Sequence, residues 1–407
     1  MQKEKYGLVL EGGGAKGAYH IGAAKALNEL DIKIGGISGT SVGALNGAML
    51  IQDDLEKAYD LWYNIKPSKV YEINDNYFQD LKDFKISKDT LLYFYNKVKD
   101  IFEKKGVDNS KIKKILQQYI KEDKIRNSNK DFGIVTISLT DKEPMELYLE
   151  DIPEGKLAEY LMASAYLPFF IREKVDGKIF LDGGFYNNLP VNLLAKRGYK
   201  NIIAVRTFGL GRSPNLSEMD LNIIEIEPSD DLGLTVDFSK EKARRNLNMG
   251  YYDTMRKFKG FIGKKYYLDF SYDDEYYFNF LCDICEKDIL ETGKIFKIEK
   301  MPPKRLLFEK LIPYIAEMLD IDKNQNYKDI IAGMIEVLAS ELKIDRYQIY
   351  NLQDLMKKIN KNLKKSNSKN NKYIPNFVFN NKLLAKAVSD ELKFKIIYTL
   401  LKSKITN

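Results

Sequence analysis

Several kinds of residue and segment are scarce in this 407-residue chain. It holds only two cysteines, Cys282 and Cys285, too few for a disulfide-stabilised secreted scaffold and too few for zinc without histidine partners. No stretch approaches the roughly 18 apolar residues of a membrane-spanning helix, and the N-terminus lacks the apolar core of an export signal. We therefore expect a cytoplasmic protein with no metal site and no cofactor, and any membrane contact to be peripheral.

Positive charge is concentrated at the C-terminal end. Residues 261–407 hold 26 of the Lys and Arg side chains against 20 Asp and Glu, and residues 356–407 hold thirteen lysines against two acids. A lysine-rich tail with an apolar helix face is typical of a peripheral surface that meets anionic lipid, and no nucleic-acid partner is expected. The expected helix over 382–402 places five apolar residues on one face: Leu384, Val388, Leu392, Ile396 and Leu400. The alternative is a helix that packs into a core and leaves its lysines in water.

The first half of the chain alternates short β-rich runs with helical patterns, which predicts a mostly parallel sheet covered by helices on both faces. We expect an α/β domain over residues 1–260. The predicted strands are 5–10, 34–38, 133–139, 178–181 and 201–207, and the predicted helices are 18–30, 42–62 and 156–165.

The second half, residues 261–407, has apolar residues spaced three and four apart and is predicted to be an all-helical domain. Its connector over 361–381 is rich in Lys, Asn and Ser, which predicts a mobile linker. The predicted helices are 276–290, 305–319, 327–342, 348–359 and 382–402.

A glycine-rich loop follows the first predicted strand and precedes a helix. Free backbone amides and a helix N-terminus then face one point, which favours an anion. The loop sequence also fits the Gly-x-Gly-x-x-Gly motif of dinucleotide-binding sites, with Asp31 nineteen residues beyond Gly12. In those sites an acidic residue ends the second strand, whereas Asp31 precedes the second predicted strand. The loop residues are Gly12, Gly13, Gly14, Ala15, Lys16 and Gly17.

A second glycine-flanked turn lies between the strand 34–38 and the next helix. It reads Gly39-Thr40-Ser41-Val42-Gly43, and this strand-to-helix context is the one in which Gly-x-Ser-x-Gly presents a nucleophilic serine. The glycines allow the tight turn, and the hydroxyl of Ser41 projects from it. The alternative is a serine that only caps the following helix.

A serine nucleophile needs a base, and the chain contains a single histidine, His20, which precedes the serine. The Ser-Asp-His order of the α/β-hydrolases is therefore impossible, and a structural role is expected for His20. Asp182 ends a predicted strand and is followed by Gly183 and Gly184, so we expect it to be the base, with a turn aspartate as the alternative. A Ser-Lys pair with Lys16 would need a strongly lowered lysine pKa, whereas an aspartate needs no shift at pH 7.

The three motifs together resemble the signature of the patatin-like phospholipases: a glycine-rich loop with a basic residue, Gly-x-Ser-x-Gly, and Asp-Gly-Gly or Asp-Gly-Ala. The resemblance continues through residues 163–170 (ASAYLPFF) and 187–191 (NNLPV), and it covers residues 5 to about 258. Lys16 stands where many members carry arginine, which keeps the charge but loses the planar fork of donors. Residues 261–407 show no such resemblance.

The resemblance implies a three-layer α/β/α fold and a lipid acyl hydrolase with a Ser41–Asp182 dyad. Asp182 would accept the Ser41 proton as the hydroxyl attacks an ester of a phospholipid or related lipid, and amides around Gly13, Gly14 and Ala15 would hold the oxyanion. Lys16 would add a positive field to the loop. The alternative function is a membrane- or protein-binding module whose hydrolase site is silent.

Overall fold

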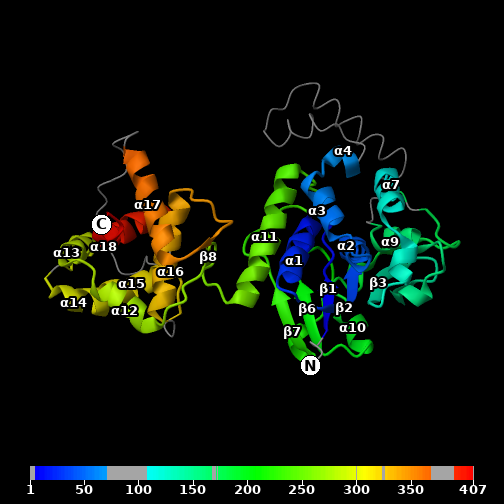
Figure 1. Cartoon of the computed structure of the whole chain (residues 1–407), viewed down its shortest axis with the longest axis horizontal. Helices are drawn as coiled ribbons and strands as arrows, with labels where there is room; N and C mark the ends of the chain where they lie inside the picture. The colour runs from blue at the N-terminus through cyan, green and yellow to red at the C-terminus, as the bar shows by residue number, and fades with distance from the viewer. Residues whose placement is uncertain are drawn as a thin grey trace, which may run out of the picture. The chain divides into compact units, whose positions relative to one another are not determined.

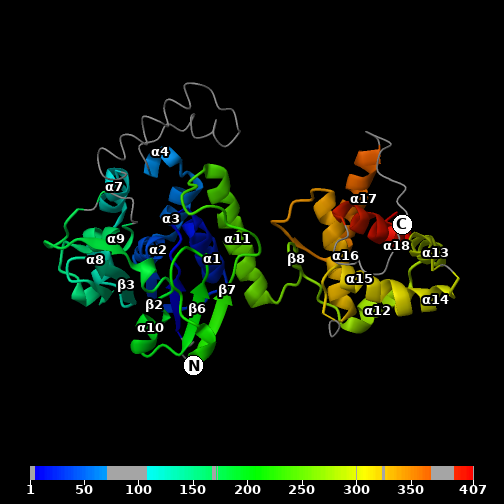
Figure 2. The same cartoon turned by 180° about the vertical axis from the view of Figure 1, so that it is seen from behind.

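The computed structural model describes residues 5–70, 108–166, 171, 173–298, 300–322, 326–367 and 389–406. The chain forms two compact units, Met1–Met255 and Arg256–Asn407. The division falls inside the helix α11 (Lys240–Lys259), five residues before the predicted boundary. Each unit has its own hydrophobic core, and Figures 1 and 2 show the two units from opposite sides.

A seven-stranded sheet forms the centre of the first unit. Its strand order is β4-β3-β2-β1-β6-β7, with β5 paired to β3. The path from β3 to β7 is parallel throughout, and only β4 and β5 run antiparallel to β3. The predicted α/β fold with a mostly parallel sheet is confirmed. The strands are β1 (Tyr6–Leu10), β2 (Ile34–Thr40), β3 (Asp131–Ser138), β4 (Glu143–Tyr148), β5 (Phe180–Asp182), β6 (Asn201–Val205) and β7 (Asn222–Ile226).

Helices cover both faces of this sheet because side chains alternate along each strand. Val9 of β1 packs against Val191 and Leu194 of α10 on one face. Its neighbour Leu10 lies on the other face, where it approaches Gly47 of α2, and α1, α2, α3 and α11 share a core on that side. The helices of this unit are α1 (Ala18–Glu29), α2 (Val42–Ile51), α3 (Leu55–Tyr63), α4 (Pro67–Val70), α7 (Ser110–Tyr119), α8 (Glu122–Arg126), α9 (Leu157–Ser164), α10 (Val191–Lys196) and most of α11.

The single helix predicted over 42–62 is wrong in one respect, because the structure divides it into α2 and α3. The break falls at Asp53, whose φ of 58° is left-handed and cannot continue a helix. Gln52 spans the break by donating to Asp54 at 2.8 Å and to the carbonyl of Tyr119 at 2.8 Å. The break turns α3 so that Trp62 faces the core shared with α1 and α11.

The second unit is helical, as predicted, apart from two short parallel strands, β8 (Tyr267–Leu268) and β9 (Ile349–Tyr350). Its core is built from apolar residues of all its longer helices. The helices are α12 (Asp274–Cys282), α13 (Glu286–Phe296), α14 (Pro303–Leu306), α15 (Ile312–Met318), α16 (Tyr327–Glu341), α17 (Leu352–Asn367) and α18 (Asp390–Thr406).

Three helix predictions for this unit need correction. The predicted helix 276–290 is interrupted between α12 and α13, near the free cysteines Cys282 and Cys285. The predicted helix 305–319 contains a π-helical turn at Leu307–Leu311, just before Pro313, which has no N–H to donate to the ladder. The predicted helix 348–359 starts later, at Leu352, because Ile349 and Tyr350 form β9.

The C-terminal tail supports the packed alternative over the membrane-facing one. Residues 361–367 of the predicted linker continue α17, and residues 368–388, which include Leu384 and Val388, lie outside the described residues. In α18 the side chains of Ile396 and Leu400 are fully buried in the core of the second unit. Their apolar face is thus occupied by protein. Among the described helices, none is long and apolar enough to cross a membrane.

Candidate active site

Ser41 occupies a sharp turn between β2 and α2. Its φ of 56° and ψ of −127° are rare for a residue with a side chain, and such strained positions cluster at active sites. The backbone amide of Ser41 donates to Oγ of Ser164 at 3.0 Å, and Ser164 donates in turn to the carbonyl of Val135 at 2.7 Å. The Ser41 hydroxyl makes no capping bond to α2, so the helix-cap alternative finds no support in the geometry.

The glycines on either side of Ser41 are required by close packing. A Cβ at Gly39 would lie 2.4 Å from the carbonyl carbon of Gly43, and a Cβ at Gly43 would lie 2.1 Å from the carbonyl oxygen of Leu10. Real Cβ atoms do not approach backbone atoms so closely. The end of β1, the Ser41 turn and the start of α2 can therefore touch only because both positions lack side chains.

The strand register brings Asp182 to the level of Ser41. Thr40 of β2 pairs with Val135 of β3, and the next residue, Thr136, pairs with Asp182 at the end of β5. Gly183 is needed here because its Cβ would lie 2.2 Å from the carbonyl oxygen of Val135. Ser41 and Asp182 are 141 positions apart in the sequence, but both lie where β3 stops pairing with β2 and begins to pair with β5.

The Asp182 carboxyl group is buried, with an exposed fraction of 3%. Its Oδ1 accepts a hydrogen bond from the amide of Gly184 at 2.8 Å, whereas Oδ2 has no hydrogen-bond partner among the described residues. Burial raises the pKa of Asp182 to about 6, although Ser41 and the Gly184 amide each lower it in part. An aspartate needs no shift to be ionised at neutral pH, and Asp182 remains ionised there, but burial of the turn brings its pKa closer to neutrality.

Two amides of the glycine loop donate to no acceptor in the part of the chain that the structure describes. The amide of Gly12 donates to the carbonyl of Asn188 at 3.0 Å, and the amide of Ala15 donates to the carbonyl of Thr235 at 2.7 Å. Within the described residues, the amides of Gly13 and Gly14 make no hydrogen bond to protein. Two of the three expected oxyanion donors are available, and the amide of Ala15 is already used.

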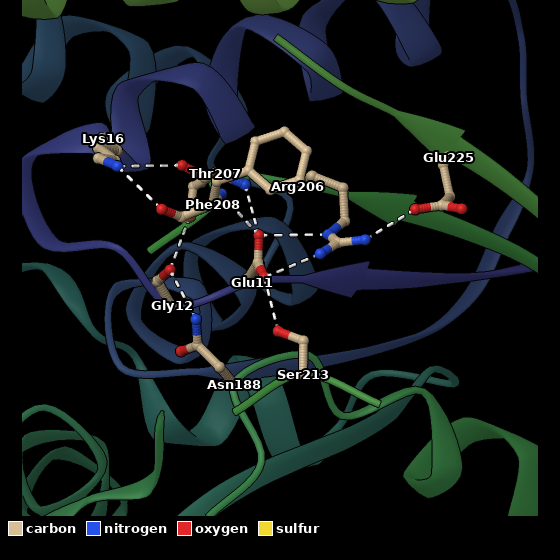
Figure 3. Close-up of polar contacts among 9 residues, drawn as sticks. All are labelled: Glu11, Gly12, Lys16, Asn188, Arg206, Thr207, Phe208, Ser213 and Glu225. Atoms are coloured by element: carbon tan, nitrogen blue, oxygen red, sulfur yellow. Dashed lines mark hydrogen bonds and ion pairs between the residues drawn. The ribbon is translucent and has the colours of Figure 1, made fainter. Parts of the chain in front are cut away.

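Lys16 is engaged as a donor. Its Nζ donates to the carbonyls of Thr207 at 3.3 Å and Phe208 at 3.0 Å, as Figure 3 shows. These two bonds direct the Lys16 side chain to the backbone of the segment that follows β6. The Lys16 base alternative therefore finds no support in this geometry. The dinucleotide alternative also lacks its acidic residue, since Asp31 lies in the turn before β2.

His20 is fully buried in α1. Its Nδ1 lies 3.3 Å from Nδ2 of Asn46, and burial lowers the pKa of His20 to about 3. Asn46 also donates to the carbonyl of Gly17 at 2.8 Å and accepts from Trp62 at 3.0 Å. This network joins α1, α2 and α3 to the end of the glycine loop, which agrees with the structural role predicted for His20.

An apolar cavity of about 160 Å³ adjoins the site. Ser41 and Gly14 are part of its wall, together with side chains from α2, α3 and α7. A larger cavity of about 700 Å³ in the second unit is lined by charged and apolar groups and includes no residue of the candidate site. The cavity of about 160 Å³ is therefore the one next to the candidate nucleophile. Its apolar wall includes Val42, Leu45, Met49, Trp62, Leu116 and Phe238.

Sequence reasoning missed three supporting residues. Ser164 holds the Ser41 amide, Asn46 holds the end of the glycine loop, and Glu11 accepts hydrogen bonds from the segment after β6. Ser164 belongs to the segment 163–170 that carried part of the family resemblance, but nothing local assigned it a partner. Residues 167–170 of that segment lie outside the described residues.

The part of the chain that contains Ser41 and Asp182 is similar to known proteins. Residues 8–195 match the family model described as patatin-like phospholipase. The patatin-like phospholipase domain-containing protein ZK370.4 of Caenorhabditis elegans is 29% identical over 206 residues, covering 49% of this chain and 13% of that protein. Patatin-like phospholipase domain-containing protein 7 of Rattus norvegicus is 30% identical over 202 residues, with the same two shares.

Two further proteins are similar to this chain. The lysophospholipase NTE1 of Kluyveromyces lactis is 28% identical over 220 residues, covering 49% of this chain and 12% of that protein. This chain thus spans only about an eighth of the length of the curated relatives it matches. The solved structure of VipD from Legionella pneumophila aligns with 99% of this chain and 92% of its own, at 15% identity and a TM-score of 0.39.

Proposed function

We propose that this chain hydrolyses carboxylic esters of lipids with Ser41 as nucleophile and Asp182 as base, because residues 8–195 match the family model of the patatin-like phospholipases. The observation that carries the proposal is the strand register that places the buried Asp182 next to Ser41, whose hydroxyl acts on the Asp182 carboxyl group as a hydrogen-bond donor and lowers its pKa. Oδ1 already accepts the Gly184 amide, so the buried Oδ2 is the oxygen left to accept a proton.

In the first step, Oδ2 of Asp182 accepts the Ser41 proton while Oγ attacks the ester carbonyl. The carbonyl oxygen becomes an oxyanion, and the free amides of Gly13 and Gly14 are the proposed donors that stabilise it. The alcohol leaves with the proton held by Asp182. Water then attacks the acyl-Ser41 ester as Asp182 accepts its proton, and collapse of the second oxyanion returns the proton to Ser41.

The raised pKa of Asp182 suits this role. A carboxylate with a pKa of about 6 is ionised at neutral pH yet accepts a proton more readily than an ordinary aspartate. The apolar cavity beside Ser41 supports an acyl chain as the group transferred, since apolar walls favour hydrocarbon over polar substrates.

A labelling experiment tests the proposal. A fluorophosphonate probe reacts with activated serines, so the wild-type chain should be labelled once and should hydrolyse nitrophenyl esters of several chain lengths. The Ser41→Ala variant should lose both properties, whereas Ser164→Ala, which keeps the nucleophile, should still be labelled. Labelling that survives in Ser41→Ala would assign the nucleophile to another residue.

A further inference from the structure

Glu11 is the last residue before the glycine loop, and its carboxylate is buried with an exposed fraction of 1%. Its Oε2 accepts the amides of Thr207 at 2.7 Å and Phe208 at 2.9 Å, and its Oε1 accepts the hydroxyl of Ser213 at 2.8 Å. Figure 3 shows these bonds converging on the carboxylate. The Glu11 side chain thus binds three residues of the segment that follows β6.

Arg206 offsets the cost of burying this charge. Its Nε lies 3.4 Å from Oε2 of Glu11, and its Nη1 donates to Glu225 at 2.8 Å. Glu225 lies on β7 and is more exposed than Glu11, so the guanidinium joins an inner carboxylate to an outer one. The outer pair provides a matched control for the inner one.

The segment held by Glu11 in turn holds the glycine loop. Oγ1 of Thr207 donates to the carbonyl of Gly12 at 2.6 Å, and Nδ2 of Asn188 donates to the same carbonyl at 3.3 Å. The packing is close, because a Cβ at Gly13 would lie 2.5 Å from Oγ1 of Thr207. Lys16 donates to the carbonyls of the two residues whose amides Glu11 accepts.

The carbonyl of Gly12 and the amide of Gly13 belong to one planar trans peptide, so they point in opposite directions. Two donors on the Gly12 oxygen therefore fix the direction of the Gly13 N–H, one of the two free amides of the loop. We propose that Glu11 is a positioning residue: through Thr207 it fixes the plane of the Gly12–Gly13 peptide and so aims the Gly13 amide at the oxyanion. This inference rests on the function proposed above.

Two variants of Glu11 separate its hydrogen-bond acceptance from mere bulk. Glu11→Gln keeps an oxygen that can accept the Thr207 and Phe208 amides, whereas Glu11→Met keeps the length and accepts nothing. A misaimed oxyanion donor costs rate and not ground-state binding, so kcat for a short ester should fall roughly tenfold to hundredfold in Glu11→Met, with KM within about twofold. Glu11→Gln should fall less, and Glu225→Gln should stay near wild type.

Thr207 tests the same pathway where Glu11→Met fails to fold. Thr207→Val keeps the shape but removes the hydroxyl that donates to Gly12, whereas Thr207→Ser keeps it. We expect Thr207→Val to lose kcat as Glu11→Met does, and Thr207→Ser to retain most of it. Equal kcat in Thr207→Val and Thr207→Ser would overturn the proposal, as would a loss that appears only in KM.

Amide hydrogen exchange tests the positioning without any turnover. The amides of Gly12 and Ala15 donate to Asn188 and Thr235, so a loosened loop should exchange them faster. Peptides covering residues 11–17 should exchange faster in Thr207→Val than in Thr207→Ser, and unchanged exchange would contradict the proposal. An inactive wild-type chain would defeat the proposed function, whereas the exchange comparison, repeated for Glu11→Met against Glu11→Gln, would still show whether Glu11 and Thr207 hold the loop.

Discussion

The indole nitrogen of Trp62 lies 3.0 Å from Oδ1 of Asn46 and donates a hydrogen bond to it. An indole N–H can only donate, so this bond fixes which end of the Asn46 amide is oxygen. Nδ2 of Asn46 is then the donor toward Nδ1 of His20, 3.3 Å away. The histidine must be neutral, with its proton on Nε2, and its buried position keeps it so.

We expect His20→Gln to retain most of the wild-type kcat, because His20 packs and accepts a hydrogen bond but transfers no proton. A glutamine can still accept from Asn46 through its carbonyl oxygen. The measurement is ester hydrolysis alongside a thermal midpoint. A variant that folds like the wild type but has no activity would require a mechanism that includes the histidine.

The pH dependence of kcat/KM should show one acid limb with a midpoint near pH 6, set by Asp182. Protonation of the carboxylate removes the base, so activity should fall about tenfold for each pH unit below that midpoint. The pKa of His20, at about 3, lies too low to produce this limb. The limb should therefore persist in His20→Gln, and its disappearance there would assign it to the histidine.

Asp182 should also destabilise the first unit at neutral pH. The pKa of Asp182 rises from 3.8 to about 6 on folding, so the folded state holds the proton more tightly than the unfolded state. The contribution of Asp182 to the free energy of unfolding is therefore fully present below pH 3.8 and is lost as the pH rises through 6. At about 1.4 kcal/mol per pH unit the loss is about 3 kcal/mol. Asp182→Asn should be more stable than wild type at pH 8, with a gain that shrinks toward pH 4, as urea unfolding can measure. A variant less stable than wild type at pH 8 would contradict this.

The buried face of α18 predicts a stability effect. Ile396→Ala should lower the free energy of unfolding of the second unit by about 2–5 kcal/mol, because Ile396 is fully buried in its core. Lys402→Ala, at an exposed position of the same helix, should change it by less than about 0.5 kcal/mol. An Ile396→Ala variant that keeps its stability but loses binding to anionic vesicles would restore the membrane-facing interpretation of the tail.

Local patterns predicted the parts of the structure that short-range chemistry decides. The turn around Ser41 was predictable because Gly39 and Gly43 lie between a strand pattern and a helix pattern, and the structure shows that both are sterically required. The strands β4 and β7 were missed, because both lie at the ends of the strand order, where polar residues such as Glu143 and Asn222 obscure the alternation.

Long-range features could not be predicted in the same way. Glu11 and Thr207 are 196 residues apart, and no local pattern indicates that one accepts the amide of the other. The pKa of Asp182 depends on burial by the surrounding fold, which a strand-turn pattern does not reveal. The amide of Ala15 is not free to bind an oxyanion because it donates to the carbonyl of Thr235, which lies in a loop far along the chain.

The proposed mechanism depends most directly on Asp182 as the base that activates Ser41. The Asp182→Asn variant keeps the side-chain shape but cannot accept the proton, and general-base assistance is worth roughly 10²–10⁴ in rate. The decisive measurement is kcat for a short ester at pH 8, compared between wild type and Asp182→Asn preparations of equal folded fraction. If Asp182 is the base, kcat should fall at least about a hundredfold in Asp182→Asn; hydrolysis by Asp182→Asn at the wild-type rate would show that Asp182 is not the base.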